Sequence, residues 1–285
     1  MPFVRARDLG QSPGLPECFS RGGCVTRAFV LAATCAYGLL TASVPSWAAT
    51  VLVTGSNRGL GYEFVRQYAA RGDTVIATTR HPQDAKELRE LAAKNKNIAV
   101  ESLDVTDQAQ IDALAAKYKS KPIDILINNA GAMGPPSSQA MGSIDHKLFQ
   151  QVMDTNVYGV MAVTMAFKDN IIASEQKKVI AITSVAGSMT GPWERLGGIY
   201  FYRASKAALN NVMRGMGIDL RKQGVIFGLV APGAADTDML RNEFGFKGRM
   251  TPASDSVAGM MKNIDAFTLE NSKKPIDFDG KVIDW

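Results

Sequence analysis

Cysteine and histidine, the residues that most often build disulfides and metal sites, are scarce in this chain of 285 residues. The cysteines are Cys18, Cys24 and Cys35, and the histidines are His81 and His146. From residue 50 onward the chain therefore has no disulfide framework, no thiolate nucleophile and no cysteine-ligated metal. The two histidines lack the HExxH spacing of a zinc site, so we expect no metal.

The chain also lacks basic runs interleaved with aromatic residues, although its formal net charge is +5. Such runs are typical of nucleic-acid-binding surfaces, so we expect no nucleic-acid partner. With 46% hydrophobic and 21% charged residues, the composition is that of a globular domain rather than of a disordered or fibrous chain. This composition permits an enzyme without indicating which one.

One apolar run stands near the N-terminus, AFVLAATCAYGLL at 28–40. It follows Arg21 and Arg27 and precedes small residues around Ala48, an order typical of a secretory signal peptide cleaved after Ala48. The run is shorter than the about 20 residues that span a bilayer, so no stable membrane span is expected. A misjudged start site or a disordered extension is the alternative. Residues 1–49 are thus an N-terminal extension, and the protein is periplasmic or secreted if the signal is cleaved and cytoplasmic if it is not.

Residues 50–285 alternate apolar β-prone runs with amphipathic stretches, which predicts parallel strands joined by helical crossovers. The expected fold class is α/β, a single domain with a doubly wound parallel sheet and helices on both faces. Strands are predicted at 50–54, 74–79, 98–102, 124–128, 178–183 and 226–230. Helices are predicted at 59–71, 84–94, 108–118, 146–174 and 201–222. Thr251 and Pro252 are expected to start one more helix as N-cap and first-turn residue, and a last strand is expected near 276–284.

A glycine-rich turn, TGSNRGLG at 54–61, directly follows the first predicted strand. Glycine lets the backbone turn tightly and approach a pyrophosphate, and the N-terminus of the next helix supplies N–H groups and a positive dipole end. A merely flexible turn would show the same glycines, but the position between a strand and a helix favours a nucleotide site. The expected cofactor contacts are Gly55, Ser56, Asn57, Arg58, Gly59, Leu60 and Gly61.

The second predicted strand ends in a basic residue where NAD-binding proteins place an acidic one. No carboxylate stands between Ile76 and Gln83, and Arg80 follows the strand. Together with Arg58, its guanidinium would grip a 2′-phosphate, which predicts NADP(H) rather than NAD(H). Two solvated surface arginines are the alternative.

From residue 50 to residue 285 an ordered set of motifs resembles the classical short-chain dehydrogenase/reductase family. The motifs are TGSNRGLG at 54, LDV at 103, NNAG at 128, Asn156, TSVAG at 183, YRASK at 202 and PGAADT at 232. YRASKAALNNVM, TDM and the closing DGKVIDW are most similar to the C-factor and sniffer-like carbonyl reductase branch. The resemblance implies a Rossmann fold and an oxidoreductase that moves a hydride between a nicotinamide and a carbonyl or alcohol group.

Reduction of a carbonyl leaves an alkoxide that needs a proton, and Tyr202 is the expected acid. Lys206 lies one helical turn further on the same face, where its charge would lower the pKa of Tyr202. Tyr200 is the rival tyrosine, but Ala204 stands where its lysine would be. We therefore expect Tyr202 and Lys206 to be catalytic.

Two further residues complete the expected catalytic group. Ser184, at the end of a buried strand, would hydrogen-bond the substrate oxygen and stabilise developing charge. The resemblance selects it over Thr183 and Ser188, and it implies that Asn156 organises a water that links Lys206 to a proton supply. A turn serine and a capping or surface asparagine are the ordinary alternatives.

The resemblance also implies contacts to the rest of the nucleotide. Asp104 would meet the adenine amino group, and Val105 would flank the ring. Tyr202 and Lys206 count among the cofactor contacts, the lysine on the nicotinamide ribose. The remaining implied contacts are Asn128 and Gly131 on the adenosine ribose side, and Pro232, Gly233 and Thr237 around the nicotinamide and its carboxamide.

The connection between Ser184 and Tyr202 is longer than is usual in the family. Its extra residues are expected to form a loop over the pocket, with Met189 and Trp193 as lining candidates. If that loop displaced Ser184 instead, the protein would bind cofactor and turn over poorly.

Together these features favour an NADPH-dependent reductase of a small or medium apolar ketone or aldehyde, whose pocket is closed by the apolar loop after Thr237. A nucleotide-binding signalling or sensor protein with incidental catalysis is the alternative, because fold alone does not separate the two. The same residues would also serve an alcohol dehydrogenase. The helices at 146–174 and 201–222 would pair across a two-fold axis in a homodimer or homotetramer.

Overall fold

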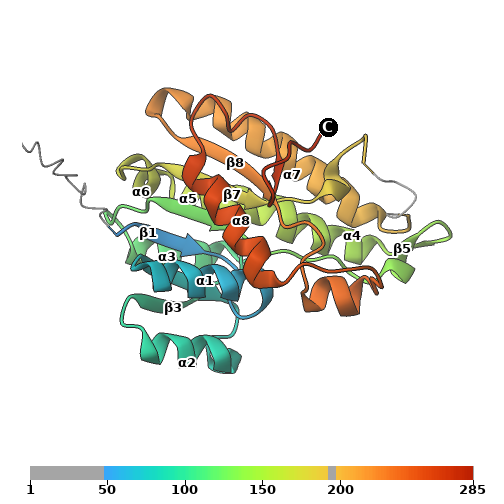
Figure 1. Cartoon of the computed structure of the whole chain (residues 1–285), viewed down its shortest axis with the longest axis horizontal. Coiled ribbons are helices and arrows are strands. Elements are labelled where there is room, and N and C mark those ends of the chain that lie inside the picture. Colours follow the sequence, from blue (N-terminus) through green and yellow to red (C-terminus); the bar gives the residue numbers. More distant parts are fainter. Residues whose placement is uncertain (1–47, 192–196, 285) are drawn as a thin grey trace, which may run out of the picture. The chain divides into compact units, whose positions relative to one another are not determined.

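The computed structural model describes residues 48–191 and 197–284. It contains a seven-stranded parallel sheet with the order β3-β2-β1-β4-β7-β8-β9 (Figure 1). The strands are β1 Thr50–Val53, β2 Thr74–Thr79, β3 Ile98–Ser102, β4 Ile125–Asn128, β7 Lys178–Ile182, β8 Ile226–Ala231 and β9 Ile276–Asp277. The order reverses direction between β1 and β4, which creates a switch point at the carboxyl ends of these two strands. The predicted α/β class with a doubly wound Rossmann sheet is confirmed.

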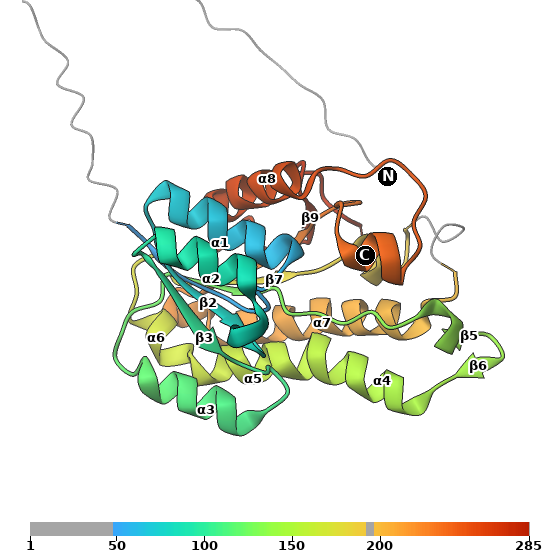
Figure 2. The same ribbon diagram turned by 90° about the horizontal axis from the view of Figure 1, so that it is seen from below.

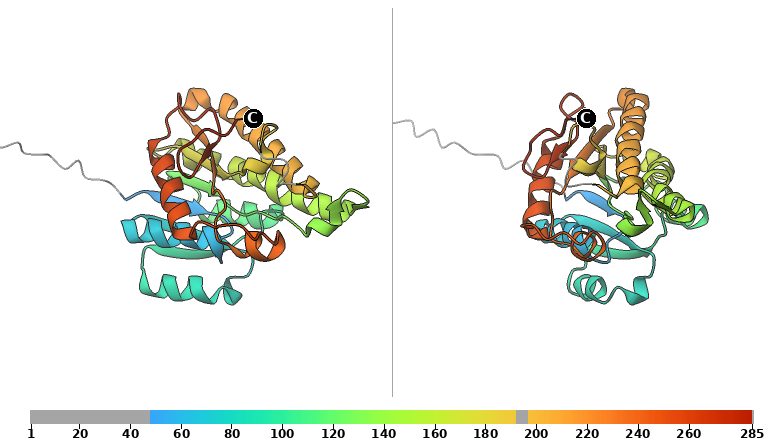
Figure 3. Two further views of the ribbon diagram at one scale, coloured as in Figure 1. Left: turned by 45° about the vertical axis from the view of Figure 1, so that its right-hand side comes forward. Right: turned by 90° about the vertical axis from the view of Figure 1, so that its right-hand side faces the viewer.

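Helices cover both faces of this sheet. They are α1 Gly59–Arg71, α2 Lys86–Lys94, α3 Gln108–Lys117, α4 His146–Met153, α5 Gly159–Ala166, α6 Lys168–Ile172, α7 Tyr200–Asp219 and α8 Ala253–Ala266. Figure 2 shows α1, α2 and α8 on one side of the sheet and α3 to α7 on the other, and the end-on view in Figure 3 shows the sheet between them. Helices α1, α2 and α3 begin and end within two residues of the predicted bounds, whereas α7 ends three residues before its predicted end.

The central strands are apolar throughout because both of their faces are covered. Along β1, Val51 and Val53 belong to the core under α1 and α8, whereas Leu52 belongs to the core under α5 and α7. All three are 0% exposed. This packing fixes the strand ends, so the loops that leave β1, β4 and β7 meet at one edge of the sheet.

Three local predictions were wrong. The helix expected at 146–174 is divided, because a π-helical turn at Asp154–Tyr158 interrupts it and it breaks again at Phe167. The strand expected at 276–284 has only two residues, because the chain turns at Gly280 and Ile276 pairs back with Val282.

The third concerns the start of α8. Thr251 is not its N-cap, because its backbone pairs with the segment after β8 in a parallel β-bridge. Its N–H donates to the carbonyl oxygen of Ala234, and its carbonyl oxygen accepts from the N–H of Asp236. Pro252 occupies the N-cap position and makes no side-chain capping bond.

The structure also contains a small hairpin that was not predicted from the sequence. Its strands are β5 Gln139–Ala140 and β6 Ser143–Ile144, and they pair antiparallel across a turn at Gly142 with φ of 89°. Strands of two residues carry too little periodicity to be recognised in the sequence.

Candidate functional site

The glycine turn forms a closely packed cradle of backbone atoms at the N-terminus of α1. A Cβ on Gly61 would lie 2.1 Å from the carbonyl oxygen of Gly55, and one on Gly55 would lie 2.9 Å from Cα of Ala130. Gly55 and Gly59 have φ of 68° and 56°, which side chains disfavour. Arg58, the N-cap of α1, makes no side-chain capping bond. The first N–H groups of α1 and the bare backbone therefore fit a pyrophosphate.

Asn129 holds this turn in place, although the motif pattern alone did not select it. Its Nδ2 donates to the carbonyl oxygens of Thr54 and Gly55 at 2.9 and 3.0 Å, and its backbone N–H donates to Thr54 Oγ1. The signal was present as the second asparagine of NNAG. The first, Asn128, is buried and donates to Thr164 Oγ1 at 3.2 Å on the α5 side. Its contact with a ribose stays a prediction.

The two arginines expected at a 2′-phosphate differ in their surroundings. Arg58 is 61% exposed, and its guanidinium lies 3.3 Å from Asp238 and 3.7 Å from Glu243, both in the segment after β8. Arg80 follows β2 with an exposed side chain. A phosphate would have to compete with two carboxylates for Arg58, so Arg80 is the more direct of the two candidates.

The expected adenine contacts lie in the turn after β3. Asp104 Oδ1 accepts from Thr106 N and Oγ1 at 2.9 and 2.7 Å, which fixes the carboxylate. Val105 is 7% exposed and lies against α5, where a Cβ on Gly159 would come within 2.8 Å of its Cγ2. The contact of this turn with adenine stays a prediction.

The residues expected around the nicotinamide follow β8. Gly233 has φ of 62°, and a Cβ there would lie 2.7 Å from the Phe278 ring. The carbonyl oxygen of Pro232 accepts a hydrogen bond from Ser256 Oγ. Thr237 lies beside the glycine turn, since a Cβ on Gly59 would be 3.6 Å from its Cγ2. The structure thus brings both expected ends of the cofactor site to one edge of the sheet.

Helix α7 and the end of β7 bring the predicted catalytic side chains together. Ser184 lies close enough to the Tyr202 hydroxyl to lower its pKa. Lys206 Nζ lies 5.6 Å from the centroid of the Tyr202 ring and donates to the carbonyl oxygen of Ile182 at 2.8 Å. The long connection therefore does not displace Ser184 from Tyr202.

The electrostatics differ from the expectation. Burial raises the pKa of Tyr202 to about 12. The Glu243 carboxylate also raises this pKa, whereas Ser184 lowers it. Burial also lowers the pKa of Lys206 to about 8. Lys206 is not among the groups that shift the pKa of Tyr202 in this structure, so its effect on the phenol stays a prediction. The Tyr202 phenol is therefore protonated at neutral pH.

Asn156 lies in the π-helical turn with 1% of its surface exposed. Its Oδ1 accepts from Ala132 N at 2.8 Å, and its Nδ2 donates to Ala132 O at 2.7 Å and to Ser205 Oγ at 2.9 Å. A Cβ on Gly131 would approach its Oδ1 to 3.4 Å. The side chain thus ties the NNAG segment to α7, and its role toward water and Lys206 stays a prediction.

The remaining lining candidates are only partly described. Met189 is 69% exposed, and Trp193 lies outside the described residues. Within residues 48–191 and 197–284, no group of three or more His, Cys, Asp or Glu side chains is arranged to hold a metal ion. In the same part of the chain, no helix combines the length and apolarity needed to cross a membrane.

A glycine cradle at the switch point of a doubly wound sheet, beside a serine, a tyrosine and a lysine, is the arrangement of a nicotinamide-dependent oxidoreductase. Residues 49–247 match the short chain dehydrogenase family, and the chain belongs to it. Within the family, its relatives include carbonyl reductases.

Three relatives support this placement. NADPH-bound carbonyl reductase from chicken fatty liver is 32% identical, with a TM-score of 0.76 over 84% of this chain and 99% of that one. Carbonyl reductase Sniffer of D. melanogaster is 25% identical, with a TM-score of 0.75 over 84% of this chain and 100% of that one. C-signal of Myxococcus xanthus is 36% identical over 61% of this chain and 99% of its own length.

Proposed function

We propose that the protein is an NADPH-dependent reductase that converts a ketone or an aldehyde into an alcohol. The observation that carries the proposal is the position of Lys206 Nζ 5.6 Å from the centroid of the Tyr202 ring, with Ser184 close to the hydroxyl of the same tyrosine. When bound, the nicotinamide would supply the hydride to the carbonyl carbon. Tyr202 would give its proton to the carbonyl oxygen, and Ser184 would donate a hydrogen bond to that oxygen as charge develops.

A pocket beside the turn that follows Ser184 is our candidate for the substrate site, although Ser184, Tyr202 and Lys206 are not among its lining residues. It lies between this turn and the C-terminal segment, and the carbonyl oxygen of Asp284 accepts a hydrogen bond from Ser188 there. Its lining residues are Val185, Ser188, Thr190, Gly191, Asp277, Lys281, Val282, Ile283 and Asp284.

The deciding experiment measures binding of NADPH and NADH to the purified protein by nicotinamide fluorescence, and then NADPH oxidation with a panel of ketones and aldehydes. Preferential NADPH binding with turnover supports the reductase. Binding without turnover on any compound supports a nucleotide sensor instead, a function for which the similarity to C-signal is the specific observation. Binding of neither cofactor would refute both.

Substitution Arg80→Asp tests the cofactor preference. An acidic side chain after β2 would repel a 2′-phosphate and accept hydrogen bonds from a ribose 2′-hydroxyl. We expect the ratio of the NADH to the NADPH dissociation constant to fall by about a hundredfold, which corresponds to two strong charge contacts. Arg89→Asp, an exchange on the exposed face of α2, is the matched control and should leave the ratio unchanged. An unchanged ratio in Arg80→Asp would remove Arg80 from the site.

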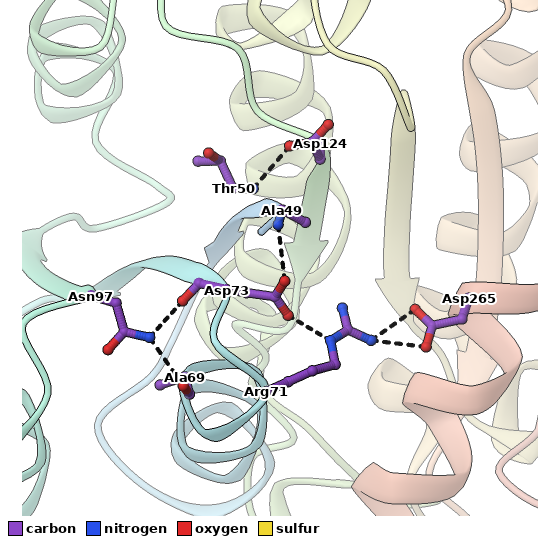
Figure 4. A network of polar contacts seen from close by, with 8 residues as sticks. All are labelled: Ala49, Thr50, Ala69, Arg71, Asp73, Asn97, Asp124 and Asp265. Atoms are coloured by element: carbon purple, nitrogen blue, oxygen red, sulfur yellow. Dashed lines mark hydrogen bonds and ion pairs between the residues drawn. The ribbon is translucent and has the colours of Figure 1, made fainter. Parts of the chain in front are cut away.

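We also propose that the chain is exported and cleaved after Ala48. Ala48 is exposed, whereas Ala49 is 3% exposed and begins the packed domain. The backbone N–H of Ala49 donates to Asp73 Oδ1 at 2.9 Å, and Arg71 holds the other carboxylate oxygen (Figure 4). After cleavage the group facing Asp73 would be an α-ammonium, which makes a stronger, charge-assisted hydrogen bond.

The first residue of the isolated protein tests this proposal. The full chain, produced in a bacterium with its export machinery, is expected to have the intact mass of 49–285. Ala48→Trp should block the cleavage, because signal peptidases need a small residue there, and Lys96→Ala on the exposed surface should not. A cytoplasmic protein that keeps the residues before Ala49 would contradict export.

A further inference from the structure

Gln139 is 0% exposed although its side chain is polar. It opens β5, the first strand of the hairpin, and its carboxamide extends to the N-terminus of α7. An amide buried without hydrogen bonds is strongly destabilising. The bonds that compensate this cost therefore show what the side chain holds together.

Both ends of the Gln139 carboxamide are bonded to backbone groups. Its Oε1 accepts from the N–H of Phe201 at 3.0 Å and from the N–H of Tyr202 at 3.1 Å. Its Nε2 donates to the carbonyl oxygens of Met133 at 2.9 Å and Gly134 at 3.1 Å. One side chain thus joins the segment after β4 to the first turn of the helix that carries the acid.

Helix α7 has no cap from its own sequence. Its N-cap residue, Ile199, makes no side-chain capping bond, and the first turn contains no acidic residue. A helix N-terminus leaves N–H groups without partners and carries a partial positive charge, which an oxygen acceptor normally satisfies. Gln139 supplies that acceptor from the hairpin, and one of the two N–H groups belongs to Tyr202.

Asn156 makes the neighbouring contact one turn further along. It binds both backbone groups of Ala132 and the hydroxyl of Ser205, which in turn donates to the Tyr202 carbonyl oxygen at 2.8 Å. The carboxamides of Gln139 and Asn156 therefore both tie the segment 132–134 to α7. Gln139 bonds the helix at Phe201 and Tyr202, and Asn156 bonds it at Ser205. Only the Gln139 carboxamide bonds the Tyr202 N–H directly.

We propose that Gln139 is a positioning residue: it caps α7 from outside and holds the Tyr202 phenol in line with Ser184. The inference rests on the proposed reductase function. A misplacement of about 1 Å at a reacting group costs up to about a hundredfold in rate. Loss of the cap lowers kcat, whereas the glycine turn, which Gln139 does not touch, keeps its affinity for NADPH.

Two substitutions separate capping from simple packing. Gln139→Met keeps the length and the apolar volume but removes the acceptor. Gln139→Glu keeps an oxygen acceptor for both N–H groups, and in its protonated form the carboxyl also keeps one donor for the carbonyl oxygens of Met133 and Gly134. A capping role predicts that kcat falls about tenfold or more in Gln139→Met and is largely kept in Gln139→Glu. A packing role predicts the reverse order, because the buried carboxylate would be the more disruptive change.

Ser143→Ala is the matched control, since Ser143 lies on the same hairpin with an exposed side chain, and its kcat should equal that of the wild type. The Kd for NADPH should stay within about twofold in every variant, as expected for a residue outside the cofactor cradle. A Gln139→Met variant with wild-type kcat, or with a higher kcat than Gln139→Glu, would overturn the proposal.

Amide hydrogen exchange gives a readout that needs no turnover. The N–H groups of Phe201 and Tyr202 are expected to exchange at least about tenfold faster in Gln139→Met, while the C-terminal half of α7 keeps its protection. If Gln139→Met does not fold, retained protection in Gln139→Glu supports the cap and lost protection overturns it. A wild-type protein that reduces no carbonyl would refute the proposed function, and the exchange rates would still decide whether Gln139 caps the helix.

Discussion

Tyr202→Phe is expected to lower kcat by about a thousandfold or more, within the range that general acids contribute. Phenylalanine keeps the ring, and with it the contact to Lys206, but it removes the only proton that this position can give to a carbonyl oxygen. Because burial keeps the pKa of Tyr202 at about 12, the wild-type phenol is protonated throughout the neutral range. The variant should therefore bind NADPH with a nearly unchanged Kd and oxidise it very slowly.

The chain offers a matched control for this substitution. Tyr200 lies on the same turn of α7 but has Ala204 rather than a lysine four residues later. Tyr200→Phe should retain kcat within about twofold of the wild-type value, as expected for a residue that takes no part in the transition state. If Tyr202→Phe retained turnover, or if Tyr200→Phe lost it, the acid would have been assigned to the wrong tyrosine. A biological effect that survived Tyr202→Phe would favour the sensor function.

Lys206→Met is expected to lower kcat by about a hundredfold or more, because it removes the positive charge beside the phenol and the ribose contact implied by the family. In the wild-type protein, kcat/KM for reduction should fall as the pH rises above about 8, since Lys206 loses its proton there. The variant should show no such decrease. Measurement of kcat/KM between pH 6 and 10 with one carbonyl substrate checks both points.

The same pKa sets the sign of a stability effect. Folding lowers the pKa of Lys206 from 10.5 to about 8, so between these values the unfolded chain binds the additional proton. The free energy of unfolding therefore rises with pH across this window, and at neutral pH the buried charge costs stability. Lys206→Met should unfold at no lower denaturant concentration than the wild type at pH 7 and should lack the rise at higher pH.

A second buried lysine provides the control for this prediction. Lys178, at the start of β7, is also 6% exposed, but its Nζ donates to the last carbonyl oxygens of α8, those of Ile264 and Asp265. Lys178→Met should leave kcat unchanged, because it removes a cation from a helix C-terminus and from nothing in the site. Equal losses of kcat in the two lysine variants would mean that Lys206 acts only by packing.

Local patterns predict much of the site. The turn from Thr54 to Gly61 was expected to lie at a helix N-terminus, and a Cβ on Gly61 would indeed meet the carbonyl oxygen of Gly55. The four-residue spacing of Tyr202 and Lys206 is enough to place them on one helical face. Ser184 was selected by the family motif, and its position close to the Tyr202 hydroxyl agrees with that selection.

Other features depend on contacts between residues far apart in the sequence. Asn129 was passed over for Asn128, because adjacent asparagines look alike until one of them is seen to bond the glycine turn. The division of the helix at 146–174 reflects the π-helical turn that aims Asn156 at Ala132. Sequence periodicity does not reveal such a turn, because the turn inserts only a single residue into the helix.

Periodicity, glycine placement and motif spacing were sufficient to identify the doubly wound sheet, the phosphate cradle and the tyrosine proposed as the acid. These properties follow from backbone geometry over a few neighbouring residues, which one stretch of chain carries by itself. The high pKa of Tyr202, the low pKa of Lys206 and the cap that Gln139 places on α7 emerged only in the folded molecule. Burial and hydrogen-bond partners set them, and both arise when distant segments pack together.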